Sequence, residues 1–164
     1  MGARVIACAS NQEKLAACKK LGADELINYD SEDLRERIKQ LTGEKGIDVV
    51  YDAVGGNYTE LALRSMAWNG RYLVVGFAAG DIPKIPLNLT LLKGCSIVGV
   101  FWGVFMRREP ASAVKNHIQL ITWLKEGKLK PLISAVYPLE NAATALNDLI
   151  QRKATGKIVL VTNR

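Results

Sequence analysis

Short apolar runs alternate with amphipathic segments up to about residue 101. Four runs rich in Val and Ile are nearly continuous rather than alternating, and they span residues 5–9, 47–51, 72–77 and 97–101. A continuous apolar run of this length predicts a strand buried on both faces, as in a parallel sheet that helices cover on each side. A weaker strand is predicted at residues 25–28.

The segments between these runs carry apolar residues at helical spacing. They predict helices over residues 12–21, 33–41 and 58–66. Gly22 and Gly43 follow the first two helices as stop signals, and Ser31 is a candidate N-cap for the second. Strands and helices that alternate in this way predict an α/β fold with a doubly wound parallel sheet.

The pattern changes after residue 101. Pro110 opens a longer predicted helix that ends near Glu126, where Gly127 stops it. The tail that follows predicts a strand at 132–137, a helix at 140–152 and a final strand at 157–161. Because this tail is not another regular strand–helix repeat, a domain boundary is placed near Gly127.

The balance of charge is positive, with 22 Lys and Arg against 16 Asp and Glu, for a net charge of +6. Such a charge raises the possibility of nucleic-acid binding, because clustered cations neutralise phosphates. Here the cations are interleaved with acids, as where Arg35 and Arg37 bracket Glu36, so the pattern indicates a solvated surface and no nucleic-acid partner. A nucleic-acid binder stays as a third alternative that retention on DNA would test.

Hydrophobic residues make up 49% and charged residues 23% of the chain, which is typical of a globular domain and excludes a disordered one. No apolar run approaches the roughly 18 residues that a membrane span needs, and the N-terminus lacks a signal-peptide pattern. Cys8, Cys18 and Cys95 are too few and too scattered for a disulfide framework or a zinc cluster. We therefore expect a cytoplasmic protein with no membrane partner.

The phosphate-binding motifs of nucleotide folds are absent. The sequence contains no G-x-G-x-x-G loop and no P-loop, although a dinucleotide fold normally holds its phosphates in the first strand–helix turn. The chain also enters its first predicted strand almost at once. These observations leave two possibilities: the chain binds no dinucleotide on its own, or it is the remainder of a longer protein.

Several motifs in order resemble the nucleotide-binding domain of the medium-chain dehydrogenases. They include Leu-Gly-Ala at 21–23, Ile-Asn-Tyr at 27–29, Asp-Val-Val-Tyr-Asp-Ala-Val-Gly-Gly at 48–56 and Gly-Arg-Tyr-Leu-Val-Val-Gly-Phe at 70–77. Phe-Trp-Gly at 101–103 is most similar to the zinc-independent, NADPH-dependent quinone oxidoreductases of the zeta-crystallin branch, as is the segment 151–157. The resemblance extends over essentially the whole chain.

This resemblance implies a domain organisation. Residues 1–127 would form a partial NADP-binding, Rossmann-like domain that lacks its first strand and its glycine loop. Residues 128–164 would be a C-terminal segment that, in the family, packs on a GroES-like catalytic domain. The chain would then be a C-terminal fragment of a protein about twice its length.

One group of candidate cofactor residues surrounds the end of the first strand. A fold that prefers NAD places an acidic residue near this point, but here Ser10 and Asn11 follow the strand and no carboxylate precedes Glu13. A 2′-phosphate would meet no repulsion there. The resemblance implies that Ser10, Lys14 and Tyr29 hold the adenosine phosphate end of NADPH. The alternative interpretation is a helix cap, a solvated lysine and a packing tyrosine.

A second group of candidates follows three successive strands, where glycine or aromatic residues lie at the carboxyl ends. Open α/β sheets bind ligands beyond these ends, and glycine lets a ligand approach the backbone. The candidate cofactor residues there are Val54, Gly55, Gly76, Phe77, Phe101 and Trp102. The alternative is ordinary turn chemistry with core aromatics, and Asp52 is interpreted as a strand-end or cap carboxylate. No catalytic residue is assigned, and no metal ligands, because His117 is the only histidine and has no partner at metal or triad spacing.

The resemblance implies an enzyme. The parent protein would transfer hydride from NADPH to a quinone or enone, the present chain alone would be inactive, and the protein would form a homodimer. The apolar residues 83–92 would lie near the dimer contact. The alternative function is a non-catalytic α/β remnant that dimerises or binds nucleotide weakly.

The absent first strand leads to a structural prediction. In the strand order 3-2-1-4-5-6 that strand is central, between the strands that contain Ile6 and Val49. Unpaired ladder groups cost about 1–3 kcal/mol each when buried. We therefore expect those two strands to pair directly, or a second chain to lie between them, or the sequence to be a portion of a longer protein.

Overall fold

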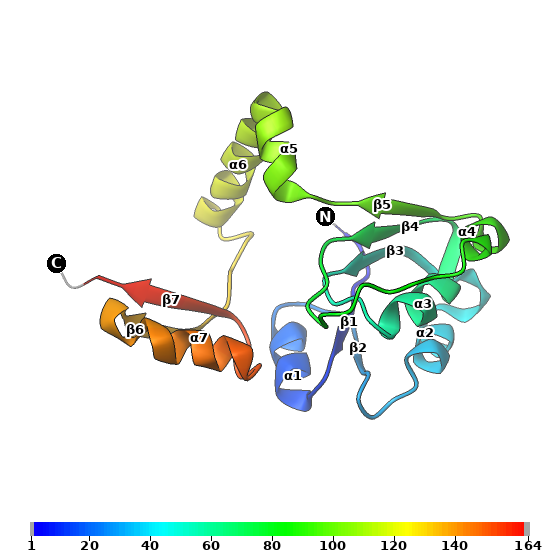
Figure 1. The fold of residues 1–164 in the computed structure, drawn as a ribbon, viewed down its shortest axis with the longest axis horizontal. Coiled ribbons are helices and arrows are strands. Elements are labelled where there is room, and N and C mark those ends of the chain that lie inside the picture. The colour runs from blue at the N-terminus through cyan, green and yellow to red at the C-terminus, as the bar shows by residue number, and fades with distance from the viewer. Residues whose placement is uncertain (1, 163–164) are drawn as a thin grey trace.

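The computed structural model describes residues 2–162, and every strand pair in it is parallel (Figure 1). The strands are β1 (Ile6–Ala9), β2 (Glu25–Asn28), β3 (Ile47–Asp52), β4 (Met66–Val74), β5 (Ser96–Gly99), β6 (Ile133–Pro138) and β7 (Lys157–Val161). They form three sheets, in the orders β1-β2, β3-β4-β5 and β6-β7. Together with the helices between them, these sheets confirm the predicted α/β class.

The helices follow the strands in the alternation that the sequence predicts. They are α1 (Gln12–Lys20), α2 (Leu34–Thr42), α3 (Tyr58–Arg64), α4 (Asn88–Lys93), α5 (Trp102–Arg108), α6 (Pro110–Lys125) and α7 (Ala142–Ile150), with short 3-10 turns at Gly43–Lys45 and Leu139–Asn141. None of the helices between residues 2 and 162 combines the length and the apolarity that a membrane crossing requires.

Side-chain caps define where α1 and α2 begin. The Oδ1 atom of Asn11 accepts a hydrogen bond of 2.9 Å from the backbone N–H of Lys14, and Oδ1 of Asp33 accepts one of 2.9 Å from Glu36. Each cap satisfies a donor that the first helical turn leaves free. The predicted cap at Ser31 is wrong, because Asp33 directly precedes the first helical residue of α2.

Three helices and one strand boundary differ from the sequence-based prediction. The predicted strand 97–101 ends at Gly99, and Phe101 is the N-cap of α5. The helix α5 was not predicted, because its first five residues are apolar or glycine and show no polar face. For the residues of the short helix α4, the sequence predicts only an apolar segment. The predicted helix 58–66 ends earlier, at Arg64, because Met66 already pairs with Ile47 in the sheet.

The core consists of two small clusters. Leu63, Met66, Tyr72 and Leu89 pack together where α3 and α4 cover the β3-β4-β5 sheet. Ile27, Leu34 and Ile38 form the second cluster between β2 and α2. Full burial of one such aliphatic side chain contributes about 1.5–3 kcal/mol to stability. These clusters fix the sheets whose carboxyl ends carry the candidate site.

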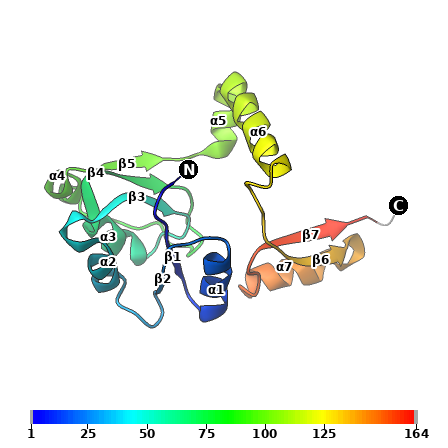
Figure 2. The same ribbon diagram turned by 180° about the vertical axis from the view of Figure 1, so that it is seen from behind.

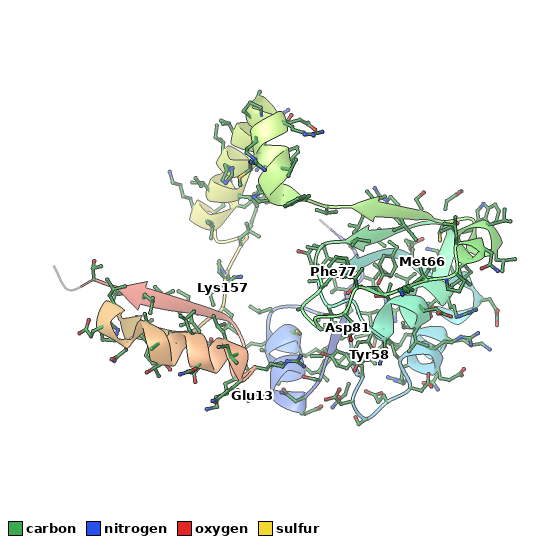
Figure 3. All side chains as sticks on the ribbon, viewed as in Figure 1. Glu13, Tyr58, Met66, Phe77, Asp81 and Lys157 are labelled. Atoms are coloured by element: carbon green, nitrogen blue, oxygen red, sulfur yellow. The ribbon has the colours of Figure 1, made fainter. Side chains whose placement is uncertain are left out.

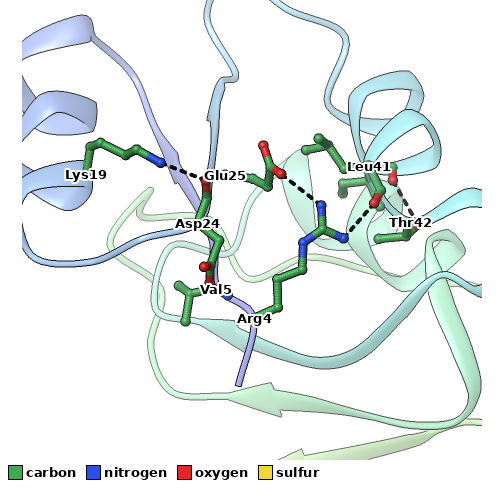
Figure 4. A network of polar contacts seen from close by, with 8 residues as sticks. Arg4, Val5, Lys19, Asp24, Glu25, Leu41 and Thr42 are labelled. Carbon is green, nitrogen blue, oxygen red and sulfur yellow. Dashed lines mark hydrogen bonds and ion pairs between the residues drawn. The ribbon is translucent and has the colours of Figure 1, made fainter. Parts of the chain in front are cut away.

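Polar contacts secure the segment that leads into β1 (Figure 4). The backbone N–H of Val5 donates to Oδ2 of Asp24 at 2.7 Å. The guanidinium of Arg4 donates to the carbonyl of Leu41 at 2.8 Å and forms an ion pair of 2.9 Å with Glu25. These contacts join the start of β1 to β2 and α2. They therefore fix the direction of β1 and, with it, the position of Ser10 after the strand.

One face of the β3-β4-β5 sheet is open in the described residues. Helices α3 and α4 cover one face, whereas Val49, Tyr51 and Val98 point to the other, and Tyr51 is 71% exposed. The prediction that these strands are buried on both faces is therefore wrong for this structure, because helices cover only one side. Direct pairing of β1 with β3 is one of the three expected outcomes. It does not occur, because the two strands belong to different sheets.

The remaining elements form two further groups beside the β1–β5 body (Figure 2). The helices α5 and α6 pack against each other as a hairpin. The strands β6 and β7 pair in parallel, and α7 packs on both of them. Gly127 follows α6 with a φ of +69° and begins the connection between the two groups. A domain boundary at this residue stays a prediction.

Candidate functional site

The first group of candidate residues lies where β1 and β2 end. Ser10 follows the last residue of β1, and Lys14 lies in the first turn of α1. Tyr29 follows β2, and its backbone N–H donates to the carbonyl of Ala9 at 3.2 Å. Both Ser10 and Lys14 are half-buried, and within residues 2–162 Lys14 forms no ion pair. A cation without a carboxylate partner therefore lies at the amino end of a helix, which favours an anion there.

Two tyrosines connect this first group to the next loop. The rings of Tyr29 and Tyr58 lie 4.5 Å apart between centroids, at 45° to each other. Tyr58 begins α3, directly after the glycine loop that follows β3. Stacked aromatic pairs at this separation are favourable. The pair therefore joins the ends of β1 and β2 to the ends of β3 and β4, although these strands belong to different sheets.

The charge of one residue in the C-terminal group also acts on Tyr58. Burial and the carboxylate of Asp30 raise the pKa of Tyr58, and the positive charge of Arg152 acts in the opposite direction. Arg152 follows α7 with a φ of +56°, which is rare for a residue with a side chain. Neither Arg152 nor Tyr58 is among the residues that the sequence predicts for the site, because no local pattern shows that residues so far apart in the chain meet.

The glycine loop after β3 is held by the carboxylate of Asp52. Its Oδ1 atom accepts hydrogen bonds from the backbone N–H groups of Val54, at 2.8 Å, and Gly55, at 2.9 Å. Its Oδ2 atom accepts from the hydroxyl of Thr59 at 3.2 Å and from the hydroxyl of Tyr72. The carboxylate thus receives four hydrogen bonds, which is about its full capacity as an acceptor.

The backbone of the same strand end holds the loop after β4. The carbonyl of Asp52 accepts from the N–H groups of Val75, at 2.8 Å, and Gly76, at 3.3 Å. The carbonyls of Ala53 and Val54 accept in turn from Ala78, at 3.1 Å, and Ala79, at 2.9 Å. The candidate residues after β3 and those after β4 are therefore parts of one hydrogen-bonded unit.

The electrostatics of this unit favour an ionised Asp52. Burial alone would raise the pKa of the carboxyl, but the hydrogen bonds from Tyr72, from the two loop amides and from Thr59 outweigh this and hold the pKa below its ordinary value. Burial and the hydrogen bond to Asp52 raise the pKa of Tyr72 far above its ordinary value. Tyr72 therefore stays a neutral donor to an ionised acceptor.

The ring of Phe77 packs against the glycine loop after β3. A Cβ built on Gly55 would lie 2.9 Å from Cδ1 of Phe77 and 3.6 Å from the carbonyl oxygen of Asp81. Figure 3 labels Phe77, Asp81 and Tyr58 in the β1–β5 body. Phe77 also borders a cavity of about 130 Å³, at whose polar end lie Asp52, Thr59 and Tyr72. The rest of the lining is apolar.

Phe101 and Trp102 lie at the start of the helical hairpin. The backbone N–H of Val100 donates to the carbonyl of Val74 at 2.8 Å, so Phe101 follows the end of β5 beside the end of β4. Trp102 packs 5.3 Å from Phe105 and 5.8 Å from His117, measured between ring centroids. Between residues 2 and 162, no hydrogen bond or aromatic ring pair joins Phe101 or Trp102 to the loop after β3.

The two loops at the carboxyl ends of parallel strands, with helices following, define a Rossmann-like α/β protein. The chain belongs to the zinc-binding dehydrogenase family, whose model matches residues 1–122, and it is similar to quinone oxidoreductase-like proteins of the medium-chain dehydrogenase superfamily. The family and fold that the sequence resembled are thereby confirmed. The family description mentions zinc, but residues 2–162 contain no group of three or more His, Cys, Asp or Glu residues that could hold a metal ion.

The relatives that match are about twice as long as this chain. It is 40% identical over 164 residues to quinone oxidoreductase-like protein 2 homolog of Nematostella vectensis, and the matched region covers 99% of this chain and 45% of that protein. It is 38% identical over 158 residues to quinone oxidoreductase-like protein 2 of Rattus norvegicus, across 96% and 45% of the two chains. A crystal structure of Escherichia coli quinone oxidoreductase complexed with NADPH has a TM-score of 0.84, at 29% identity, over 98% of this chain and 50% of that one.

Proposed function

We propose that this chain is the cofactor-binding part of an NADPH-dependent oxidoreductase that transfers hydride to a quinone or enone. The observation that carries the proposal is the pairing of Tyr29 with Tyr58. This pair joins the end of β1, where Ser10 and Lys14 lie and no carboxylate stands between the strand and Glu13, to the loops after β3 and β4. A solved relative complexed with NADPH supports the same assignment.

The residues around Ser10 would hold the 2′-phosphate. Lys14 would supply a charge-assisted hydrogen bond and Ser10 a neutral one. Arg152 would add a second cation from the C-terminal segment, since its charge already acts on Tyr58. The carboxylate of Asp30 also acts on Tyr58 and would repel an anion. The preference for a phosphate therefore depends on both Lys14 and Arg152. A charge-assisted contact contributes roughly 1.5–3 kcal/mol, or about 10- to 150-fold in affinity.

The loops after β3 and β4 would hold the remainder of the cofactor. Gly76 leaves room for a ligand to approach the backbone, and Gly55 would lie beside the cofactor with the Phe77 ring against it. Val54, Phe77, Phe101 and Trp102 would provide apolar contacts and exclude water. When bound, the cofactor supplies the hydride, and the protein supplies position and orientation. Acid or base groups, if the reaction uses them, would come from the part of the protein that lies outside this chain, so we expect this chain alone to be inactive.

Nucleotide titrations test the proposal directly. We expect the chain to bind NADPH more tightly than NADH when each is titrated under saturation-transfer NMR, which detects weak binding. Lys14→Gln and Arg152→Gln should each lower the preference for NADPH by about tenfold. Lys20→Gln is the matched control, because Lys20 is an exposed cation on the same helix. Equal affinities of the unmodified chain for the two nucleotides would contradict the proposal.

The alternative function is a non-catalytic module that dimerises or binds nucleotide weakly, and the exposed strand β5 supports its dimerisation. β5 has a neighbour only on its β4 side among the described strands, and all four of its residues are exposed. An unprotected edge of this kind pairs readily with another strand. We propose a homodimer in either case. Sedimentation velocity should show a dimer that Val98→Lys converts to a monomer, and a monomeric unmodified chain would contradict this.

A further inference from the structure

The end of strand β3 carries an arrangement that the proposed function does not use. We propose that Asp52 is a positioning residue, which holds the loops after β3 and β4 in the one arrangement that a cofactor would meet, and that the Tyr72 hydroxyl fixes the carboxylate that does so. The inference rests on the proposed function, because it assigns the cofactor to those loops. It adds residues that touch no cofactor themselves.

Asp52 connects the two loops through separate parts of the same residue. Its carboxylate accepts from the amides of Val54 and Gly55, and its backbone carbonyl accepts from the amides of Val75 and Gly76. Each loop thus donates two hydrogen bonds to Asp52. A rotation of this one side chain would change the position of the first loop relative to the second.

Two side chains prevent that rotation. Tyr72 is 2% exposed and lies in the core cluster with Leu63 and Leu89, and Thr59 is 6% exposed. Both hydroxyls donate to Oδ2 of Asp52. Rigid support of this kind is what holds binding groups in a productive position. Because packing in the core fixes the tyrosine ring, its hydroxyl holds the Asp52 carboxylate, and thereby the loops, in a fixed position relative to the core.

A role for Asp52 as a general base does not fit this geometry. All four of its acceptor directions already receive a hydrogen bond from the protein, so none is left for a substrate proton. The competing interpretation is an ordinary strand-end cap that stabilises the fold and does nothing for a ligand. The two roles differ in whether loop order and cofactor affinity change when the fold is retained.

Tyr72→Phe is the informative variant, since it keeps the ring in the core and removes only the hydroxyl. Asp52→Asn is the second variant, because the amide oxygen can still accept from Val54 and Gly55 while the amide nitrogen becomes a donor toward Tyr72. The matched control is Asp48→Asn in the same strand, where the carboxylate is exposed and pairs with Lys45 at 2.9 Å. The control should leave every measurement unchanged.

The first measurement is amide hydrogen exchange, which needs no nucleotide. We expect the amides of Val54 and Gly55 to exchange at least about tenfold faster in Tyr72→Phe, while the amide of Leu73 in the core strand keeps its rate. Unchanged exchange at both loop amides in Tyr72→Phe and in Asp52→Asn would overturn the positioning role.

The second measurement is nucleotide affinity. We expect NADPH and NADH to lose affinity by the same factor, about tenfold, in both variants. The ratio between the two nucleotides should stay constant, because the 2′-phosphate end is untouched. Faster exchange with unchanged affinity would overturn the positioning role alone. An unmodified chain that binds neither nucleotide would overturn the proposed function, and the positioning role would be lost with it.

Discussion

The ring of Phe77 lies directly against Gly55, so close that a Cβ on Gly55 would be 2.9 Å from Cδ1 of Phe77. The backbone of Gly55 also has a φ of +72°, which a side chain disfavours. Gly55→Ala should therefore destabilise the protein by about 1–3 kcal/mol, combining backbone strain with a displaced ring. Urea unfolding measures this loss, and a midpoint equal to that of the unmodified chain would contradict the contact.

Gly76 gives the opposite expectation for stability. A Cβ at this position would meet the carbonyl oxygen of Ala53 at 3.4 Å and its Cα at 4.0 Å, both ordinary contacts, and the φ of Gly76 lies outside the left-handed region. Gly76→Ala should therefore unfold within about 0.5 kcal/mol of the unmodified chain. If the cofactor approaches the backbone here, NADPH affinity should still fall by about tenfold. A variant that loses no affinity would remove Gly76 from the site.

Acid should weaken the fold through Asp52. The pKa of this carboxyl lies below its ordinary value of 3.8, because the hydrogen bonds that it accepts outweigh the effect of burial. A group whose pKa is lower in the folded state contributes stability above the unfolded value and loses it as the pH falls through the folded value. The free energy of unfolding should thus decrease below about pH 4. Asp52→Asn should show a shallower decrease, whereas the exposed Asp48→Asn should follow the unmodified chain.

Cys8 should react slowly at neutral pH although part of the residue is exposed. Burial raises the pKa of its thiol to about 11, with smaller contributions from Cys18 and Glu32. Because only the thiolate attacks, alkylation of Cys8 by iodoacetamide should speed up by about tenfold per pH unit until the pH approaches that value. Peptide mass spectrometry follows the site, with Cys8→Ser as the control. Rapid labelling of Cys8 at pH 7 would contradict this prediction.

Leu63 should be one of the most costly side chains to truncate. It is fully buried in the cluster between α3 and β4, so Leu63→Ala should cost about 2–5 kcal/mol in the free energy of unfolding. Leu61 lies on the same helix and is 38% exposed, so Leu61→Ala should cost less than about 1 kcal/mol. Similar losses for the two variants would show that the cluster does not support the sheet.

The positions of most elements could be predicted because apolar spacing is a local property. The runs that contain Ile6, Val50 and Ile97 all form parallel strands, and α6 begins at Pro110 as the sequence predicts. The helix α5 could not be predicted, since a segment that begins Trp-Gly-Val-Phe-Met carries no helical periodicity. Burial of both sheet faces was expected from the same runs, but a sequence pattern does not show which elements cover a face.

In the candidate site, too, local features could be predicted from the sequence and contacts between distant residues could not. The absence of a carboxylate near Ser10 and the glycines that follow Asp52 can be read directly from the sequence, because each concerns neighbouring residues. The partners of Asp52 cannot, since Tyr72 comes 20 residues later and reaches the carboxylate only because the sheet register pairs it with Val50.

The sequence by itself therefore determined the fold class, the family resemblance and the residues at the strand ends, since these depend on spacing along the chain. Only the tertiary structure decided that Tyr58 meets Tyr29, that Arg152 approaches from the C-terminal segment, and that β1 and β3 belong to separate sheets. Contacts between distant residues depend on strand register and helix packing, which are set by the burial of the whole chain rather than by any one segment.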